Sequence, residues 1–129
     1  MSTDAYLGNP NLKKVNTPVE FTEEQILEYQ KCANDPLYFM EKYIQIVSLD
    51  EGLIPFKLYD FQKKIVKTIH ENRFTICKLP RQSGKSTTTI SYLLHYALFN
   101  PNSNIALLAN KSSTARDILG RLQLAYENL

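Results

Sequence analysis

The feature that most constrains this chain is a Gly-Lys-Ser triplet at the junction of two apolar patterns. The stretch "KLPRQSGKSTTT" (78–89) ends the β-rich run "RFTICKL" and opens a helical pattern. A strand before such a triplet and a helix after it form the context in which it binds phosphate. The sequence therefore predicts a strand–loop–helix unit. A phosphate-binding loop is one interpretation of it, and a plain lysine-bearing turn is the alternative.

The residues at this junction have the properties that phosphate binding needs. A helix N-terminus offers free N–H groups and the positive end of the helix dipole, and Gly84 lets the backbone approach an anion closely. Lys85 would reach the β- and γ-phosphates, and Ser86 would place its hydroxyl on Mg²⁺. Thr87 offers a second hydroxyl near the α-phosphate. The motif lacks its usual first glycine, because Leu79 occupies that position.

Gln62 is a second candidate, about twenty residues upstream, in the first turn of the helix predicted before the strand. An exposed helix residue is one interpretation. The other is functional, because an amide supplies one donor and one acceptor and so matches the two-sided edge of adenine. The sequence leaves both open.

Turn and cap signals divide the chain. Residues 1–20 contain Gly, Pro and Asn without periodicity, which predicts a mobile arm. Residues 21–56 are predicted to form a helical lead-in. Thr22 and Gln25 have the spacing of a capping box, and Asp35 and Pro36 start a second helix. That helix is expected to carry one apolar face: Phe39, Met40, Tyr43, Ile44 and Val47.

From residue 57 onward the predicted elements alternate. A helix over "LYDFQKKIVKTIHEN" precedes the strand "RFTICKL", and a helix over about 85–99 follows the Pro80–Gly84 loop. The turn "NPNSN" leads to a second strand, "IALLA", and to a last helix capped by Ser112 or Ser113. This order is typical of an α/β fold with buried parallel strands.

Composition narrows the class of protein. The 129 residues fit one domain, and 43% hydrophobic with 22% charged residues argues against wholesale disorder. A net charge of +2 gives no electrostatic case for nucleic-acid binding. There is no membrane-length apolar run and no signal-peptide pattern, so we expect a soluble intracellular protein. Cys77 is expected to be a small buried hydrophobe, and His70 and His95 to be structural or surface residues.

Three stretches together carry a family resemblance: "YDFQKKIV", "FTICKLPRQSGKSTTTISYLLHYALF" and "IALLANKSSTARDILGRL". They resemble the start of the ATPase domain of the large terminase subunit of tailed bacteriophages, most closely that of contractile-tailed myoviruses. The likeness runs from about residue 21 to the end. Arg-Gln-x-Gly-Lys without the first glycine is characteristic of that family's deviant Walker A motif. The resemblance implies a P-loop NTPase fold of the ASCE/RecA-like type, a parallel sheet with helices on both faces, of which residues 57–129 would be the N-terminal half.

The resemblance also implies roles for single residues, with ATP and Mg²⁺ as cofactors. Lys85 and Ser86 match the phosphate-binding lysine and the Mg²⁺-site hydroxyl, and Gln62 matches the adenine-recognising glutamine. Arg81 matches an arginine proposed to stabilise charge during γ-phosphate transfer, for which a guanidinium has suitable geometry. Some relatives carry a second glutamine where this chain has Lys57. The complete set of expected nucleotide contacts is Gln62, Arg81, Gln82, Ser83, Gly84, Lys85, Ser86 and Thr87.

The full-length relatives couple ATP hydrolysis to packaging of double-stranded DNA into the prohead, in the host cytoplasm, with the portal protein and the small terminase subunit as partners. The Asp-Glu pair of Walker B and the nuclease domain have no counterpart here, and Asp117 and Glu127 are predicted on a solvated helix. We therefore expect the chain alone to be inactive as an ATPase, and to self-associate because its strands lack neighbours. The alternatives are a segment of another P-loop translocase or helicase-like ATPase, and a non-catalytic nucleotide-binding or interaction module.

Overall fold

The computed structural model describes residues 5–129 and contains five helices and two small sheets over that range. The helices are α1 (Glu23–Asn34), α2 (Pro36–Tyr43), α3 (Asp60–Glu71), α4 (Lys85–Phe99) and α5 (Ser112–Glu127). The strands are β1 (Ala5–Tyr6), β2 (Asn9–Lys13), β3 (Gln45–Ser48) and β4 (Gly52–Pro55). None of the described helices has the length and apolar character needed to cross a membrane.

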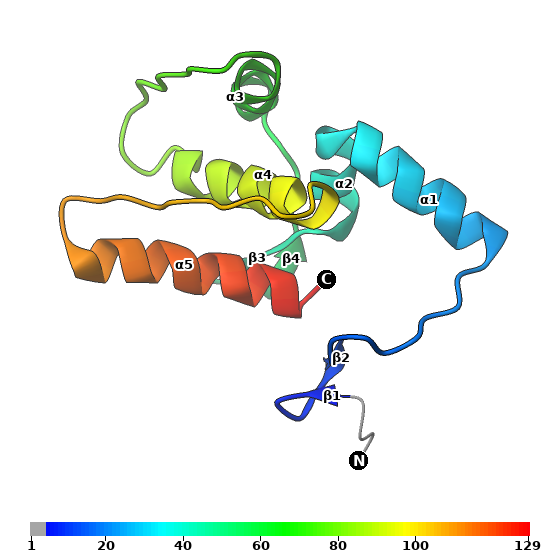
Figure 1. Ribbon diagram of the computed structural model, residues 1–129. Coiled ribbons are helices and arrows are strands. Elements are labelled where there is room, and N and C mark those ends of the chain that lie inside the picture. The colour runs from blue at the N-terminus through cyan, green and yellow to red at the C-terminus, as the bar shows by residue number, and fades with distance from the viewer. Residues whose placement is uncertain (1–4) are drawn as a thin grey trace.

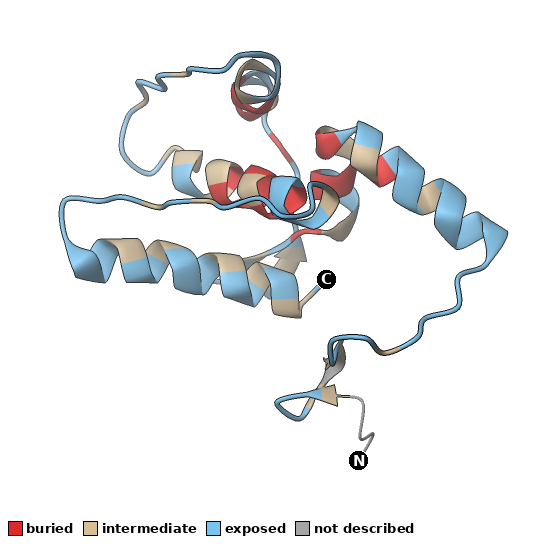
Figure 2. Cartoon of the chain, in the orientation of Figure 1, coloured by how far each residue is buried: buried red, intermediate tan, exposed pale blue. Residues whose placement is uncertain are grey.

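Helix α4 lies at the centre of the molecule, and the other helices pack around it (Figure 1). Helices α2, α3 and α5 all contact α4, and α1 packs on α2. The fully buried side chains include Met40, Ile44 and Val66, from α2, its C-terminal cap and α3. Figure 2 places most of the buried residues on α2, α3 and α4, with Cys32 on α1 and Phe56 and Leu58 before α3, whereas α5 has none. The core is therefore formed by helices, with α4 at its middle.

The helix starts follow the signals in the sequence. Thr22 caps α1, and Thr22 and Gln25 form both hydrogen bonds of the predicted capping box. Asp35 caps α2 by accepting a hydrogen bond from the Tyr38 N–H, with Pro36 at the first helical position. Helix α4 spans the predicted residues. Only α5 differs, because its N-cap is Lys111, which makes no side-chain cap bond, and not Ser112 or Ser113.

The second lead-in helix is shorter than predicted. It ends at Tyr43, and "QIVS" instead pairs antiparallel with "GLIP", with Ile46 opposite Ile54. Ile46 and Val47 are both β-branched, which favours a strand over another helical turn. Ile44 is still buried, but Val47 is exposed on the hairpin and not on the predicted apolar face. A second short hairpin, β1–β2, lies within residues 5–13, inside the stretch that was predicted to be a mobile arm.

The predicted parallel sheet is wrong. Across residues 5–129 the only sheets are the two antiparallel hairpins, so the chain does not adopt a P-loop parallel-sheet fold. "RFTICKL" and "IALLA" form no strand, and Cys77, expected to be buried, is exposed. We call residues 73–79 and 104–109 the two open segments. A β-strand is stable only when a neighbouring strand satisfies its backbone, and neither open segment has such a neighbour in the described chain.

Candidate phosphate-binding site

The N-terminus of α4 is the centre of the candidate site. The helix begins at Lys85, and Gly84 precedes it with φ +75° and ψ 14°, in the left-handed region. Gln82 also has a positive φ, of 59°. A left-handed residue joined to a right-handed one turns successive N–H groups toward the same side, which creates an anion-binding concavity. The loop therefore presents free backbone donors at the positive end of a 15-residue helix.

Gln62 lies directly against this loop. A Cβ placed on Gly84 would be only 2.5 Å from Gln62 Nε2, so no larger residue fits without moving the amide. Gln62 is only 3% exposed, and its Oε1 accepts a hydrogen bond of 2.9 Å from the Tyr59 N–H at the start of α3. The interpretation of Gln62 as an exposed helix residue is therefore wrong. Its side chain joins the N-terminus of α3 to the N-terminus of α4.

Lys85 is folded back over the loop. Its Nζ donates a hydrogen bond of 3.2 Å to the Leu79 carbonyl oxygen, six residues earlier. The ammonium group therefore spans the loop between its two ends. A phosphate oxygen at this place would be a stronger acceptor than a neutral carbonyl, because a hydrogen bond between two charged groups is stronger than one to a neutral acceptor.

Ser83 has an unpaired hydroxyl. Among the described residues, its Oγ is the one buried side-chain polar atom without a hydrogen-bond partner. Leaving a buried hydroxyl unpaired costs about 1–3 kcal/mol. Such an atom beside a helix N-terminus is therefore an independent sign that the loop accommodates a polar ligand.

A hollow of about 760 Å³ lies beside the loop, within the range typical of small-molecule sites. Gln82, Ser83 and Gly84 of the loop, Thr87 of α4 and Gln62 of α3 all line it. The rest of the lining comes from β3, β4 and the start of α3, and it includes three aromatic residues and two charged ones: Phe56, Tyr59, Phe61, Glu51 and Lys57. The Tyr59 and Phe61 rings stack at a centroid distance of 5.9 Å and remain exposed. The sequence signal for them was their proximity to Gln62, since Phe61 directly precedes it and Tyr59 lies three residues before it.

The other predicted residues lie elsewhere around α4. Lys85 and Ser86 line a separate hollow of about 290 Å³ with Cys77 and Leu108. Arg81 is exposed and lines none of these hollows. The structure thus places Gln62 with three loop residues and with Thr87 of α4, but it does not place Arg81, Lys85 or Ser86 in the same hollow.

The residues fit Mg²⁺ only in part. Mg²⁺ usually takes one or two carboxylates in addition to phosphate oxygens and water. Ser86 could supply a hydroxyl, but residues 72–116 contain no Asp or Glu. No group of three or more His, Cys, Asp or Glu able to hold a metal occurs within residues 5–129. Ser86 and the phosphates of a bound nucleotide would therefore hold the ion, without a carboxylate from this segment.

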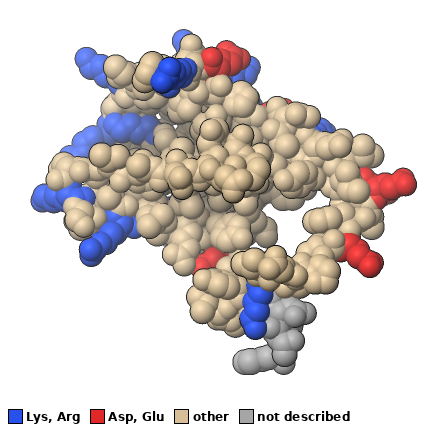
Figure 3. Space-filling model, in the orientation of Figure 1, with Lys and Arg blue, Asp and Glu red and all other residues tan. Residues whose placement is uncertain are grey.

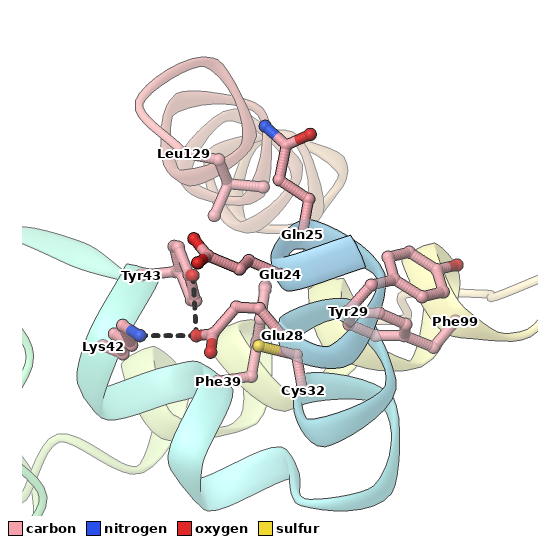
Figure 4. Close-up of a pocket in the computed structure, with 10 residues that line it drawn as sticks. All are labelled: Glu24, Gln25, Glu28, Tyr29, Cys32, Phe39, Lys42, Tyr43, Phe99 and Leu129. Carbon is pink, nitrogen blue, oxygen red and sulfur yellow. Dashed lines mark hydrogen bonds and ion pairs between the residues drawn. The ribbon is translucent and has the colours of Figure 1, made fainter. Parts of the chain in front are cut away.

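A second hollow, of about 490 Å³, lies between α1, α2 and the end of α4 (Figure 4). Its most strongly bonded residue is Glu28, which accepts hydrogen bonds from Lys42, Tyr43 and Tyr38. These bonds lower the pKa of Glu28 to about 2, with that from Lys42 contributing most. The Glu28 carboxylate on α1 is already saturated by hydrogen bonds from these three α2 residues, so the hydrogen bonds link α1 to α2.

His95 is also structural. It is buried in α4, and its Nε2–H donates a hydrogen bond of 2.8 Å to the Cys32 carbonyl oxygen, which can only accept. Burial lowers the pKa of His95. The imidazole is therefore a neutral link between α1 and α4.

No protein-family model matches the sequence, so the likeness to large terminase subunits depends on the motifs quoted above.

Proposed function

We propose that this chain binds ATP, with Mg²⁺, at the N-terminus of α4, as a segment of a phage terminase large subunit. The full-length protein of that type would use ATP hydrolysis to move double-stranded DNA into a prohead in the host cytoplasm, together with a portal protein and a small terminase subunit. The proposal rests on the loop and the helix that follows it, and it does not require a parallel sheet.

The observation that carries the proposal is the combination found at one helix N-terminus. Gly84 adopts a left-handed conformation, Lys85 reaches across the loop, and the Ser83 hydroxyl is buried without a partner. Each feature favours an anion with several oxygen atoms, and together they match a polyphosphate better than a single carboxylate. The adjoining hollow with its exposed Tyr59–Phe61 pair has room for a flat base.

Titration calorimetry with Mg·ATP tests this proposal. Lys85→Ala should reduce the affinity for ATP below detection, because the charge that meets the phosphates is lost. Lys67→Ala removes an exposed lysine on α3 and serves as the matched control, with unchanged affinity. Equal affinity of the wild-type chain and Lys85→Ala would refute the phosphate site.

The same titration tests recognition of the base. Gln62→Glu keeps an oxygen that can accept from the Tyr59 N–H but loses the amide donor, so it separates base contact from capping of α3. We expect this variant to weaken ATP more than GTP. Equal losses for both nucleotides would show that Gln62 does not contact adenine.

We further propose that the chain alone does not hydrolyse ATP at a motor-like rate. Hydrolysis needs a carboxylate that completes the Mg²⁺ site or orients water. Residues 72–116 carry none, and the carboxylate that lines the hollow beside the loop is Glu51, an exposed residue of the turn between β3 and β4. A phosphate-release assay with Lys85→Ala as the contamination control measures this. Turnover at about 1 s⁻¹ or faster in the wild-type chain alone would show that a carboxylate such as Glu51, Asp117 or Glu127 takes part.

A further inference from the structure

The β3–β4 hairpin forms a wall of the hollow beside the phosphate loop. Ser48 pairs with Gly52, which leaves a three-residue turn, 49–51, closed by Gly52 at φ +75°. A short turn that ends in a left-handed glycine is a common hairpin connection. At the base of the hairpin the Phe56 N–H donates a hydrogen bond of 3.0 Å to the Ile44 carbonyl oxygen, and both residues are buried. The hairpin is therefore anchored in the core, and the position of its turn is defined.

Glu51, the last residue of this turn, lines the hollow together with the loop residues Gln82, Ser83 and Gly84. It is the one carboxylate among the residues that line the hollow. Lys57 lines the hollow too, but it forms no ion pair with Glu51, and the Glu51 carboxylate has no hydrogen-bond partner within residues 5–129. An ionised carboxylate only accepts hydrogen bonds. The wall of the hollow thus carries a charged acceptor that no donor of the described chain satisfies.

The charge around the hollow determines how a nucleotide can lie in it. Lys78, Arg81 and Lys85 lie in or beside the phosphate loop. In Figure 3 the Lys and Arg side chains gather over this loop and the start of α5, and acidic side chains lie over α1 and α3. Phosphates are therefore attracted to the loop and repelled by the Glu51 carboxylate. The part of the nucleotide that faces Glu51 must be one that donates hydrogen bonds.

A nucleotide has two kinds of donor apart from its phosphates: the ribose hydroxyls and the amine of the base. The base is the expected partner of Gln62, whose Oε1 accepts from the Tyr59 N–H while its Nε2 can still donate. The ribose carries two adjacent hydroxyls, and the two oxygens of a carboxylate can accept from both, with the added strength of a charged acceptor. Dinucleotide-binding folds use an Asp or Glu for a ribose hydroxyl in the same way. The ribose therefore matches Glu51 better than the amine does.

We propose that Glu51 binds the 2′- and 3′-hydroxyls of the ribose, so that the β3–β4 hairpin makes the site selective for ribonucleotides. This inference rests on the proposed ATP site and adds to it a residue from outside the loop and α3. The Glu51 carboxylate accepts two hydrogen bonds, while the phosphates lie at the N-terminus of α4 and the base lies toward Gln62. Glu51 should therefore contribute to the affinity for nucleotides but not to the affinity for a bare polyphosphate.

Titration calorimetry on the whole chain tests this with the magnesium complexes of ATP, 2′-deoxy-ATP, 2′,3′-dideoxy-ATP and inorganic tripolyphosphate. The wild-type chain should bind ATP about tenfold more tightly than dideoxy-ATP, a difference of about 1.4 kcal/mol, with 2′-deoxy-ATP between them. In Glu51→Ala the three nucleotides should bind equally, at the level of dideoxy-ATP, because the acceptor for the hydroxyls is gone. Tripolyphosphate should bind this variant at least as tightly as it binds the wild-type chain.

Asp50→Ala is the matched control, since Asp50 is an exposed carboxylate of the same turn that does not line the hollow. It should keep the preference for ATP, and circular dichroism can verify that both variants are folded. A preference for ATP over dideoxy-ATP that is missing in the wild-type chain, or that survives in Glu51→Ala, overturns the ribose contact but leaves the ATP site standing. Weaker tripolyphosphate binding by Glu51→Ala also overturns it, because Glu51 would then act at Mg²⁺. A wild-type chain that binds no ATP refutes the ATP site and the ribose contact together.

Discussion

The α1–α2 region and the two open segments are similarly apolar in sequence, yet only the first is packed. Phe39, Met40 and Ile44 are buried, whereas Phe74 and Ile76 face solvent. The difference follows from how each backbone is satisfied. A helix satisfies its own N–H and C=O groups, so two capped helices can pack as soon as their apolar faces meet. A strand needs a partner from elsewhere, and its side chains cannot be buried before that partner is present.

The largest expected effect tests this comparison directly. Met40→Ala removes a fully buried side chain and should lower the free energy of unfolding by about 2–5 kcal/mol. Ile76→Ala removes an exposed side chain of similar size and should change it by no more than about 0.5 kcal/mol. Urea denaturation of both variants measures the contrast. A loss of similar size for Ile76→Ala would mean that the open segment is packed in solution.

A pair of glycines provides the next test. Gly84 and Gly52 both have φ +75°, but only Gly84 lies against Gln62. Gly52→Ala should cost about 1–2 kcal/mol, the strain of a left-handed residue with a Cβ. Gly84→Ala should cost about 1 kcal/mol more, which is in the range for an added group that a packed site accommodates poorly. The added Cβ would clash with the Gln62 amide, which the Tyr59 N–H holds in place. Thermal unfolding of the two variants measures this difference. Equal losses of stability for Gly84→Ala and Gly52→Ala would mean that the Gln62 side chain moves away freely.

The sequence predicted the starts of α1, α2 and α4 because their signals are local. The capping box at Thr22, the Asp35–Pro36 start and the Gly84–Lys85 start each act within one turn. The parallel sheet was a prediction of another kind, since "FTICKL" and "IALLA" have strand composition but strand formation depends on neighbours far along the chain. Within the site, Gly84 and Lys85 were recognisable from the motif. The contact of Gln62 with Gly84 and the Tyr59–Phe61 pair depend on how α3 packs against α4, which no local pattern encodes.

The packed region should also respond to pH. The pKa of His95 is lowered by burial, so the unfolded chain takes up a proton at a higher pH than the folded one. Stability is therefore complete above the ordinary histidine pKa, about 6.5, and falls as the pH drops below it. His95→Gln keeps a donor for the Cys32 carbonyl and should flatten this dependence between about pH 7 and 5. Urea denaturation at several pH values measures this. If the free energy of unfolding of His95→Gln still falls with pH as steeply as that of the wild-type chain, another group is responsible for the pH dependence.

The smallest expected effect compares two helix starts. Thr22→Ala removes the side-chain cap of α1 and should cost about 1 kcal/mol. Ser112→Ala leaves α5 nearly unchanged, because the cap position there is Lys111, with no side-chain cap bond. Chemical denaturation resolves this difference. A larger loss for Ser112→Ala would place the start of α5 at a different residue.

The hydrogen bond from Lys85 to Leu79 has a consequence for the thermodynamics of anion binding. The span between these two residues is already closed, so the conformational entropy of closing it is lost during folding and not when a ligand arrives. An incoming anion would exchange one acceptor of the ammonium group for a stronger one and would need little further ordering of the backbone. Binding at this loop should therefore be driven by enthalpy, with a smaller entropic penalty than that of a loop that becomes ordered only around its ligand.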